Sequence, residues 1–437
     1  MAVYLGGNKV SLHGLNKVLE SSNVNSSLPV HFIDYDGTIL CTYSVEDFLA
    51  LESMPPNPNH SGLTAQGWNW SLEDAKAQLT TCPEAGLTIG QMYITDDGKT
   101  RLYVHFEEGR LHPYLGICPN GTVVVDWGDN SATSTLTGTS LTTVQHANHE
   151  YASAGDYIIT LTVSSGEFAF YGVSNTAHIL KKDTSTTANF HRVYTNCLQK
   201  VEIGNSVSIG NYAFNYCYSL ASITIPNTVT SIGNSAFYYC ISLVSVIIPN
   251  TVMSIGTYAF YSCYSLVNIT IPNTVTSIGN YMFSYCYSLT SITIPNTVTS
   301  IGNNAFRNCT SLVNVIIPNT VMSIETYVFY SCYSLASITI PNTVTSIGNN
   351  AFSACYSLTS ITIPDGVMSI GNNVFNSCYG VAKYHFLSTT PPTLGTTALS
   401  STQSDCIIYV PQGSLSAYQA AENWSDYASY MQEEPAT

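Results

Sequence analysis

Hydrophobic residues recur with a fixed period over the second half of the chain. Phenylalanines occur every 23 residues between Phe214 and Phe375, and a cysteine follows each of them by three residues. In one unit, Leu243, Val246 and Ile248 form the apolar side of a short predicted strand, which the next residue, a proline, ends because it cannot donate to a sheet. No such unit can bury its apolar side alone. The pattern therefore predicts a solenoid of stacked turns that is capped at both ends.

The spacing of apolar residues within the unit, L-x-x-L-x-L, is that of leucine-rich repeats. We expect residues 183–380 to form eight 23-residue repeats with an N-terminal cap, and residues 381–437 to form the C-terminal cap. Charged residues make up only 9% of the chain. Stacking explains the deficit, because a charge repeated in every turn would lie opposite like charges. The charged residues between positions 201 and 380 are Glu202, Arg307, Glu325 and Asp365.

The residues before the solenoid predict two further parts. Residues 88–182 contain stretches of period-two alternation, such as Tyr157–Val163, and these predict an immunoglobulin-like β-sandwich. Residues 1–87 predict an α+β segment, in which Ser44 caps a short helix and Ser71 opens another with a capping box. The expected fold is therefore mainly β, with an N-terminal α+β segment, a sandwich and a leucine-rich repeat solenoid.

The repeat resembles the BspA-like leucine-rich repeats of bacterial surface antigens. Their unit, roughly I-P-x-x-V-x-x-I-G-x-x-A-F-x-x-C-x-S-L, appears almost verbatim from Ile225 to Leu243. The resemblance covers eight units and continues into the tail, where Thr390–Leu394, Ile408–Pro411 and Trp424 look like the family's terminal cap. Members of this family are implicated in adhesion to host proteins and cells, and the resemblance implies such a role here.

Two other resemblances concern the parts before the solenoid. The strings Trp127–Asn130 and His149–Tyr157 resemble the PKD module, a spacer domain of surface proteins, although the usual W-x-F-G-D-G is shortened to W-G-D-N. Met1–Val10 and Gly62–Trp70 resemble segments of tail proteins of phages and prophages of gut Firmicutes. The second resemblance implies that residues 1–87 anchor the chain to other virion or surface proteins.

One short segment suggests catalysis. Asp34–Thr38 matches the D-x-D-G-T motif of haloacid dehalogenase-like phosphatases, in which the first carboxylate attacks phosphorus. Such an enzyme needs a doubly wound sheet, and only about 55 residues separate the motif from the predicted sandwich. We therefore favour a hairpin over 32–40 and a second hairpin turn at Asp96–Lys99, and expect no enzyme activity.

We expect neither a cofactor nor a metal site. The cysteines of the repeat have no histidine or C-x-x-C partner, which favours buried thiols over zinc ligands.

Composition narrows the partners and the location. The formal net charge of −15 argues against nucleic acid. We expect no membrane insertion, because no apolar stretch is long enough to span a bilayer, and we see no signal peptide. These features favour a phage virion, with the bacterial cell surface as the alternative.

Tyrosines around each phenylalanine are the candidate ligand surface. With serine and asparagine they resemble the composition of antibody paratopes, although they could equally stack along the solenoid and brace it. The expected partner is a cell-surface glycan or protein, and the leading hypothesis is a phage tail or receptor-binding component. The alternatives are a bacterial adhesin and a purely structural part that binds its own copies as a homo-oligomer. The candidate residues are Tyr212, Tyr216, Tyr218, Tyr238, Tyr239, Tyr258, Tyr261, Tyr264, Tyr281, Tyr285, Tyr287, Tyr330 and Tyr333.

Overall fold

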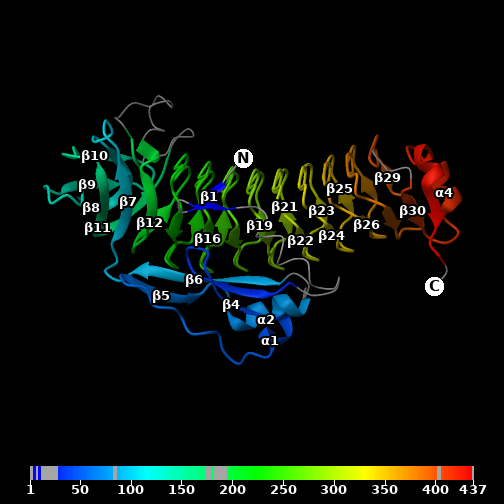
Figure 1. Ribbon diagram of the computed structural model, residues 1–437, viewed down its shortest axis with the longest axis horizontal. Coiled ribbons are helices and arrows are strands. Elements are labelled where there is room, and N and C mark those ends of the chain that lie inside the picture. The colour runs from blue at the N-terminus through cyan, green and yellow to red at the C-terminus, as the bar shows by residue number, and fades with distance from the viewer. Residues whose placement is uncertain are drawn as a thin grey trace.

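The computed structural model confirms a mainly β chain with a long solenoid (Figure 1). The structure describes residues 28–81, 86–172, 179–181, 194–400 and 405–435, and the backbone of a small hairpin made by β1 (Val3–Leu5) and β2 (Asn8–Val10). Residues 182–193, where the predicted N-terminal cap of the solenoid begins, lie outside this description, as does Cys82.

Each turn of the solenoid contributes two strands to two rows of parallel strands, in which equivalent residues of successive turns pair. The strands of one row have two to four residues and are called the longer strands here, and those of the other row have two and are called the shorter strands. The longer strands are β14 (Ser222–Thr224), β16 (Ser245–Ile247), β18 (Asn268–Thr270), β20 (Ser291–Ile292), β22 (Asn314–Ile316), β24 (Ser337–Thr339) and β26 (Ser360–Ile363). The shorter strands are β15 (Ser231–Ile232), β17 (Ser254–Ile255), β19 (Ser277–Ile278), β21 (Ser300–Ile301), β23 (Ser323–Ile324), β25 (Ser346–Ile347) and β27 (Ser369–Ile370).

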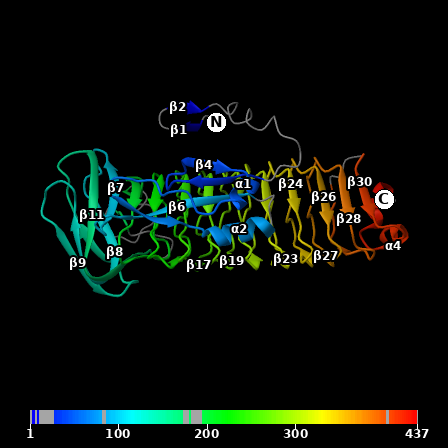
Figure 2. The same cartoon turned by 90° about the horizontal axis from the view of Figure 1, so that it is seen from below.

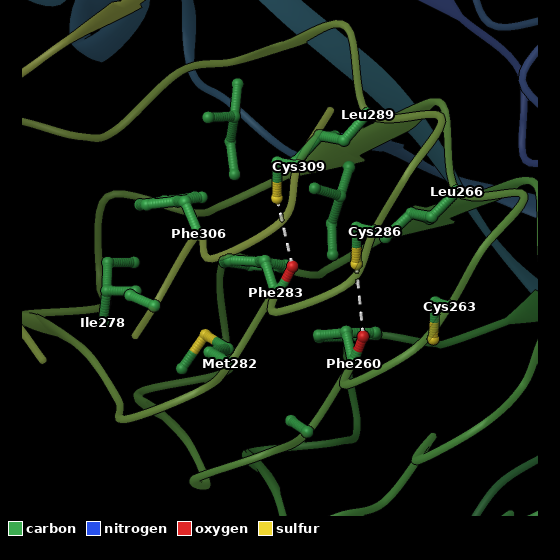
Figure 3. Close-up of a cluster of buried hydrophobic side chains, with 14 of the residues drawn as sticks. Phe260, Cys263, Leu266, Ile278, Met282, Phe283, Cys286, Leu289, Phe306 and Cys309 are labelled. Atoms are coloured by element: carbon green, nitrogen blue, oxygen red, sulfur yellow. Dashed lines mark hydrogen bonds between the residues drawn. The ribbon is translucent and has the colours of Figure 1, made fainter. Parts of the chain in front are cut away.

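The phenylalanines and cysteines of the repeat form the centre of the core (Figure 3). The rings of Phe260 and Phe283 stack with centroids 5.7 Å apart, and those of Phe283 and Phe306 are 5.5 Å apart. The thiol of Cys286 donates to the carbonyl oxygen of Phe260 at 3.2 Å, and the thiol of Cys309 donates in the same way to Phe283. These two thiols thus each bond a carbonyl oxygen of the preceding turn inside the core.

The predicted sandwich strands close the N-terminal end of the solenoid. They are β7 (Thr100–Phe106), β8 (Tyr114–Asp126), β9 (Ser134–Thr139), β10 (Gln145–Asn148) and β11 (Gly155–Phe170). β7 pairs antiparallel with β12 (Leu198–Glu202), and β11 pairs parallel with β13 (Val207–Ile209), so both solenoid sheets continue into this part. Phe170 extends the phenylalanine stack, with its ring 5.1 Å from that of Phe214. One apolar core runs through both parts, so these strands form an end cap rather than a separate spacer.

The W-G-D-N and H-x-Y strings meet at one corner of this cap. The Trp127 and His149 rings stack at 4.8 Å, and His149 Nε2 lies 2.7 Å from a carboxylate oxygen of Asp129. The Tyr151 hydroxyl donates to the carbonyl oxygen of Trp127 at 2.8 Å. These contacts account for the strings as a structural brace.

The N-terminal part has a four-stranded sheet in the order β4-β3-β6-β5, with two helices beside it. Its elements are β3 (Val30–Ile33), β4 (Ile39–Tyr43), α1 (Val45–Leu49), β5 (Leu63–Trp68), α2 (Leu72–Thr81) and β6 (Leu87–Thr95). The hairpin over 32–40 is confirmed, because β3 pairs antiparallel with β4. Ser44 and Ser71 accept the backbone N–H of Asp47 and Asp74, each at 3.0 Å, so both predicted helix starts are also confirmed.

The end of this sheet corrects two expectations. The alternation from residue 88 onward predicts that the sandwich begins there, but β6 pairs with β3 and β5 instead. The turn at Asp96–Lys99 joins β6 to β7, which lie in different sheets, so the prediction of a hairpin there was wrong. A period of two identifies a strand, but it does not say which sheet the strand joins.

The N-terminal sheet lies along the solenoid and covers the outer side of β14, β16 and β18 (Figures 1 and 2). Ile247 is only 4% exposed because it packs against Ile33 and Met92. Gly90 is required at this contact, since a Cβ atom there would lie 2.5 Å from the Ile247 side chain. Polar bonds flank the apolar contact, and the side-chain amide of Gln66 both donates to Asn227 and accepts its backbone N–H.

A compact cap closes the C-terminal end. Trp424 is fully buried and donates to the carbonyl oxygen of Pro392 at 2.8 Å, while Tyr418 donates to Ser388 at the same distance. The cap elements are β28 (Lys383–Phe386), β29 (Thr393–Leu394), β30 (Ile407–Val410), α4 (Leu415–Ala420), the 3-10 helix Ser425–Tyr430 and β31 (Met431–Glu433).

The contact at Ile247 has a matched control in the chain. Ile316 is the equivalent residue three turns later and is half-buried, and most other turns have threonine there. We expect Ile247→Thr to lower the free energy of unfolding by about 1–2 kcal/mol through lost apolar burial, and Ile316→Thr to change it by less than about 0.5 kcal/mol. Urea unfolding measures both, and equal effects would contradict the docked position of the N-terminal sheet.

The Asp129 carboxylate predicts sensitivity to acid. Burial raises its pKa, but hydrogen bonds from Ser131 and His149 outweigh burial and lower the pKa to about 2. The stabilisation is therefore present above about pH 4 and is lost as the pH falls towards the folded-state value. We expect Asp129→Asn to lower the melting temperature at neutral pH and the difference from wild type to disappear near pH 2. A difference that stays constant with pH would contradict this account.

Candidate functional site

The segment between the shorter and the longer strand of each turn presents the candidate tyrosines. Two residues in every such segment have a left-handed backbone, one two residues before the phenylalanine and one two residues after it. Tyr258 and Ser262 are an example, both with φ of 58°. Hydrogen bonds between turns stabilise this backbone, as where Phe260 N–H donates to Met282 O at 3.0 Å. The stacked turns therefore hold rigid a conformation that non-glycine residues rarely adopt.

Asparagines after the Gly of the repeat align the turns along this edge. The side-chain oxygen of Asn280 accepts the backbone N–H of Asn303 at 2.8 Å, and that of Asn303 accepts the N–H of Thr326 at 3.2 Å. The amide oxygen is thus used within the solenoid, while each side chain keeps its NH₂ group as a hydrogen-bond donor.

The tyrosines form columns, by which we mean residues at equivalent positions in successive turns. Tyr258 stacks on Tyr281 with ring centroids 4.7 Å apart, and Tyr238 stacks on Tyr261 at 4.8 Å. Contacts at this distance stabilise the edge, so bracing is one role of these rings. Of the 13 candidates, Tyr287 and Tyr333 are exposed and the others are half-buried.

The candidate residues omit Tyr327, which continues the column of Tyr258 and Tyr281, and two further tyrosines of the same surface. Tyr356 and Tyr379 are 44% and 53% exposed and continue the column of Tyr333, with Tyr333 and Tyr356 stacked at 4.8 Å. The 23-residue period could have identified them, since each follows a cysteine of the repeat directly.

The edge of the solenoid that carries these tyrosine columns, which we call the tyrosine edge, is almost free of charged residues. Burial, and then the neighbouring Tyr216 and Tyr239, raise the pKa of the Tyr238 hydroxyl to about 12. Burial likewise raises the pKa of Tyr261 above its ordinary value. These hydroxyls are therefore neutral donors and acceptors at physiological pH.

A groove of about 620 Å³ interrupts the edge where the column of Tyr258 and Tyr281 continues with an asparagine. Asn304 is 5% exposed and lies between Tyr281 and Tyr327 in its column. Arg307 lies beside it, with its guanidinium carbon 5.5 Å from the ring centroid of Tyr327 and 5.1 Å from that of Tyr330. The groove thus combines a cation, amides and aromatic rings.

The D-x-D-G-T segment has a structural role. The buried Asp34 accepts the N–H of Tyr35 at 2.8 Å, and its other oxygen lies 2.7 Å from His60 Nε2. Asp36 is exposed and accepts the N–H of Thr38, which stabilises the turn. The sheet around them mixes parallel and antiparallel pairs and is not the doubly wound sheet that the phosphatase hypothesis requires.

The thiol column is buried and bonded. Burial raises the pKa of Cys378 to about 12, and it also raises the pKa of Cys286 well above its ordinary value. Within the described residues, no three His, Cys, Asp or Glu side chains gather as a metal site would require. A search of the same residues for a helix that could cross a bilayer found none.

The model of the BspA type leucine rich repeat region matches six copies, over residues 158–266, 207–332 and 278–404. These matches together cover more than half of the sequence. The chain belongs to this family. The resemblance seen in the repeat is thereby confirmed, while residues 1–157 lie outside the matches, so the PKD and phage tail resemblances stay predictions.

Several solved structures of leucine-rich repeat proteins are similar in part. The leucine rich repeat protein of T. pallidum is 33% identical over 36% of this chain and 72% of its own, with a TM-score of 0.33. A leucine rich cell surface protein of Faecalibacterium prausnitzii is 26% identical over 56% and 82%, with a TM-score of 0.26. A leucine-rich repeat protein of Eubacterium ventriosum is 24% identical over 57% of this chain and 74% of its own, with a TM-score of 0.37. No curated protein matches the sequence.

The buried thiols predict chemical inertness. We expect the eight repeat cysteines, from Cys217 to Cys378, to resist alkylation by iodoacetamide at pH 8 in the native protein and to react fully in urea. Peptide mapping by mass spectrometry identifies the labelled positions. Labelling of several repeat cysteines without loss of the fold would show that the column is accessible, contrary to the structure.

Proposed function

We propose that this BspA-type repeat protein is a non-enzymatic recognition and adhesion protein that binds a glycan or protein of a cell surface through the tyrosine edge. The observation that supports this most directly is the distribution of covered surface. The N-terminal sheet covers β14, β16 and β18, whereas the column from Tyr287 to Tyr379 is open to solvent. Rigid aromatic rings lose little entropy on binding, which suits them to recognition.

The family suggests where the protein is located. BspA-like proteins are surface antigens implicated in adhesion, and this favours the surface of a bacterial cell. A phage tail or other virion component is the second setting, and it rests on the resemblance of Met1–Val10 and Gly62–Trp70 to tail proteins. Immunodetection of the protein on intact cells and in purified virions of the same culture distinguishes the two.

The structure also bears on how residues 1–87 would join other proteins. Gln78 on α2 accepts the backbone N–H of Asn296 at 3.0 Å, so one side of this helix is committed to the solenoid. Helix α1 lies farther from the solenoid (Figure 1). We propose that contacts with virion or surface proteins are made through this helix.

A structural role is the second candidate, because the tyrosines also stack on one another. The solenoid would then act as an assembly surface for other copies of the chain. The test below separates this role from recognition.

The exposed tyrosine column and an exposed methionine column provide a matched pair of variants. In the column that runs from Tyr287 to Tyr379, one turn has a threonine, Thr310. Four turns also have threonine at the position of Met253, Met322 and Met368, so threonine is tolerated in both columns. We expect the triple change Tyr333→Thr, Tyr356→Thr and Tyr379→Thr to weaken binding at least about tenfold, because aromatic anchors dominate interface energies. The control is the triple change to threonine at the three methionines, which should bind as wild type.

Binding of the fluorescently labelled full chain to a panel of gut bacterial cells and mammalian matrix proteins gives the result. Equal binding by both triple variants would exclude recognition through this edge, and the structural role would then be favoured. Circular dichroism melts of both variants verify that the solenoid remains folded.

A further inference from the structure

We propose that the groove at Asn304 and Arg307 binds an acidic sugar residue, a pyranose ring that carries a carboxylate. This proposal rests on the recognition function above and names the chemical class of its ligand. In this groove the tyrosines of the column, the asparagines that align the turns and the guanidinium of Arg307 lie together.

The column of Tyr258, Tyr281 and Tyr327 has an asparagine, and so lacks a ring, at one position in this groove. Tyr258 and Tyr281 stack at 4.7 Å, and the next position in the column is Asn304, followed by Tyr327. Tyr281 and Tyr327 are two turns apart, roughly 10 Å at the usual spacing of paired strands. One flat ring between them would lie at about the stacking distance from each, and a pyranose has that size and an apolar face.

Within the described part of the chain, most of the Arg307 donors have no hydrogen-bond acceptor. Its Nη1 donates to the side-chain oxygen of Asn304 at 3.5 Å, and its Nε is buried without a hydrogen-bond acceptor. Among the described residues no carboxylate lies within ion-pair distance of the guanidinium, and Glu325 instead accepts a bond from Ser323. A ligand carboxylate would give this planar cation a paired acceptor.

Arg307 is also the one basic residue between positions 201 and 380. A single arginine in a stack of neutral turns avoids the repulsion that a repeated cation would cause. The rings of Tyr327 and Tyr330 hold the guanidinium against the solenoid surface through cation–π contacts. The charge is therefore fixed at one position along the edge.

The remaining lining suits hydroxyl groups. Asn280 and Asn303 use their side-chain oxygens on backbone N–H groups, so their NH₂ groups can donate to a sugar. Thr326 and Asn350 add further polar groups, and the volume of about 620 Å³ falls in the range of small-ligand sites. An acidic peptide side chain could reach Arg307, but it would offer no flat ring to the rings of Tyr281 and Tyr327. The full set of groups therefore favours an acidic sugar.

Two variants and one control test the proposal in the full-length protein. Asn304→Tyr closes the groove at this position with the residue that the same column has at Tyr258, Tyr281 and Tyr327, whose backbones are also left-handed, so the variant should fold. Arg307→Gln removes the charge. Asn373→Tyr makes the same change as the first variant in the same column, outside the groove.

Calorimetric titration uses a tetrasaccharide that contains two glucuronate residues and the same tetrasaccharide with its carboxylates reduced to alcohols. We expect wild type and Asn373→Tyr to bind the acidic form, at least about tenfold more tightly than the reduced form. Arg307→Gln should lose this preference, and Asn304→Tyr should bind neither form.

Equal binding of the two sugars by wild type, or unchanged binding by Asn304→Tyr, would overturn the proposal. Binding of a hexaglutamate peptide as tightly as the acidic sugar would show that the groove recognises carboxylates of protein instead, and would overturn it too. Cell staining separates this result from the wider function. If wild type and Asn304→Tyr stain cells equally and neither binds the acidic sugar, the proposal fails and recognition through the tyrosine edge stands.

Discussion

The stacking of each residue on its own counterpart in the next turn determines almost every other feature of this protein. Any side chain in the solenoid must tolerate a copy of itself at one strand spacing, about 4.8 Å. Phenylalanine rings, asparagine amides and tyrosine rings stabilise the stack when they are repeated. A repeated thiol is tolerated because it donates to a carbonyl of the adjacent turn rather than to another thiol. A charge repeated in every turn would repel its own copies, which explains why the surface consists of neutral polar groups. The groove at Arg307 is consistent with this constraint, since its cation is not repeated.

A stack of parallel strands also has two open ends, and the rest of the chain covers them. β7 and β11 extend the two sheets at one end, and Trp424 with Tyr418 fills the other. The N-terminal sheet then covers the longer strands near the first end. Among the residues that the structure describes, the tyrosine edge, the exposed methionine column and the strand surface of later turns around Ile316 remain uncovered. Uncovered surface on an otherwise rigid and capped solenoid is where a partner can bind.

The sequence predicted the solenoid correctly because a 23-residue period translates directly into stacked turns. It also predicted the helix starts at Ser44 and Ser71, which depend on residues close in sequence. The place of β6 was not predictable, because its alternation fits either sheet equally well. The docking of this sheet depends on the fit of Gly90 to Ile247, two positions far apart in the chain. The groove had a visible signal, Asn304 in a tyrosine column beside the only arginine of the repeats, but its shape requires the neighbouring turns in three dimensions.

The most direct test of binding through the tyrosine edge is hydroxyl-radical footprinting of the full chain, free and bound to the cells that it stains. Tyrosine and methionine both react readily, so the two exposed columns report in one experiment. We predict that Tyr287, Tyr333, Tyr356 and Tyr379 become protected on binding, while Met253, Met322 and Met368, which are 64–67% exposed in the free protein, react as before. Protection of the methionines with the tyrosines unchanged would contradict the account.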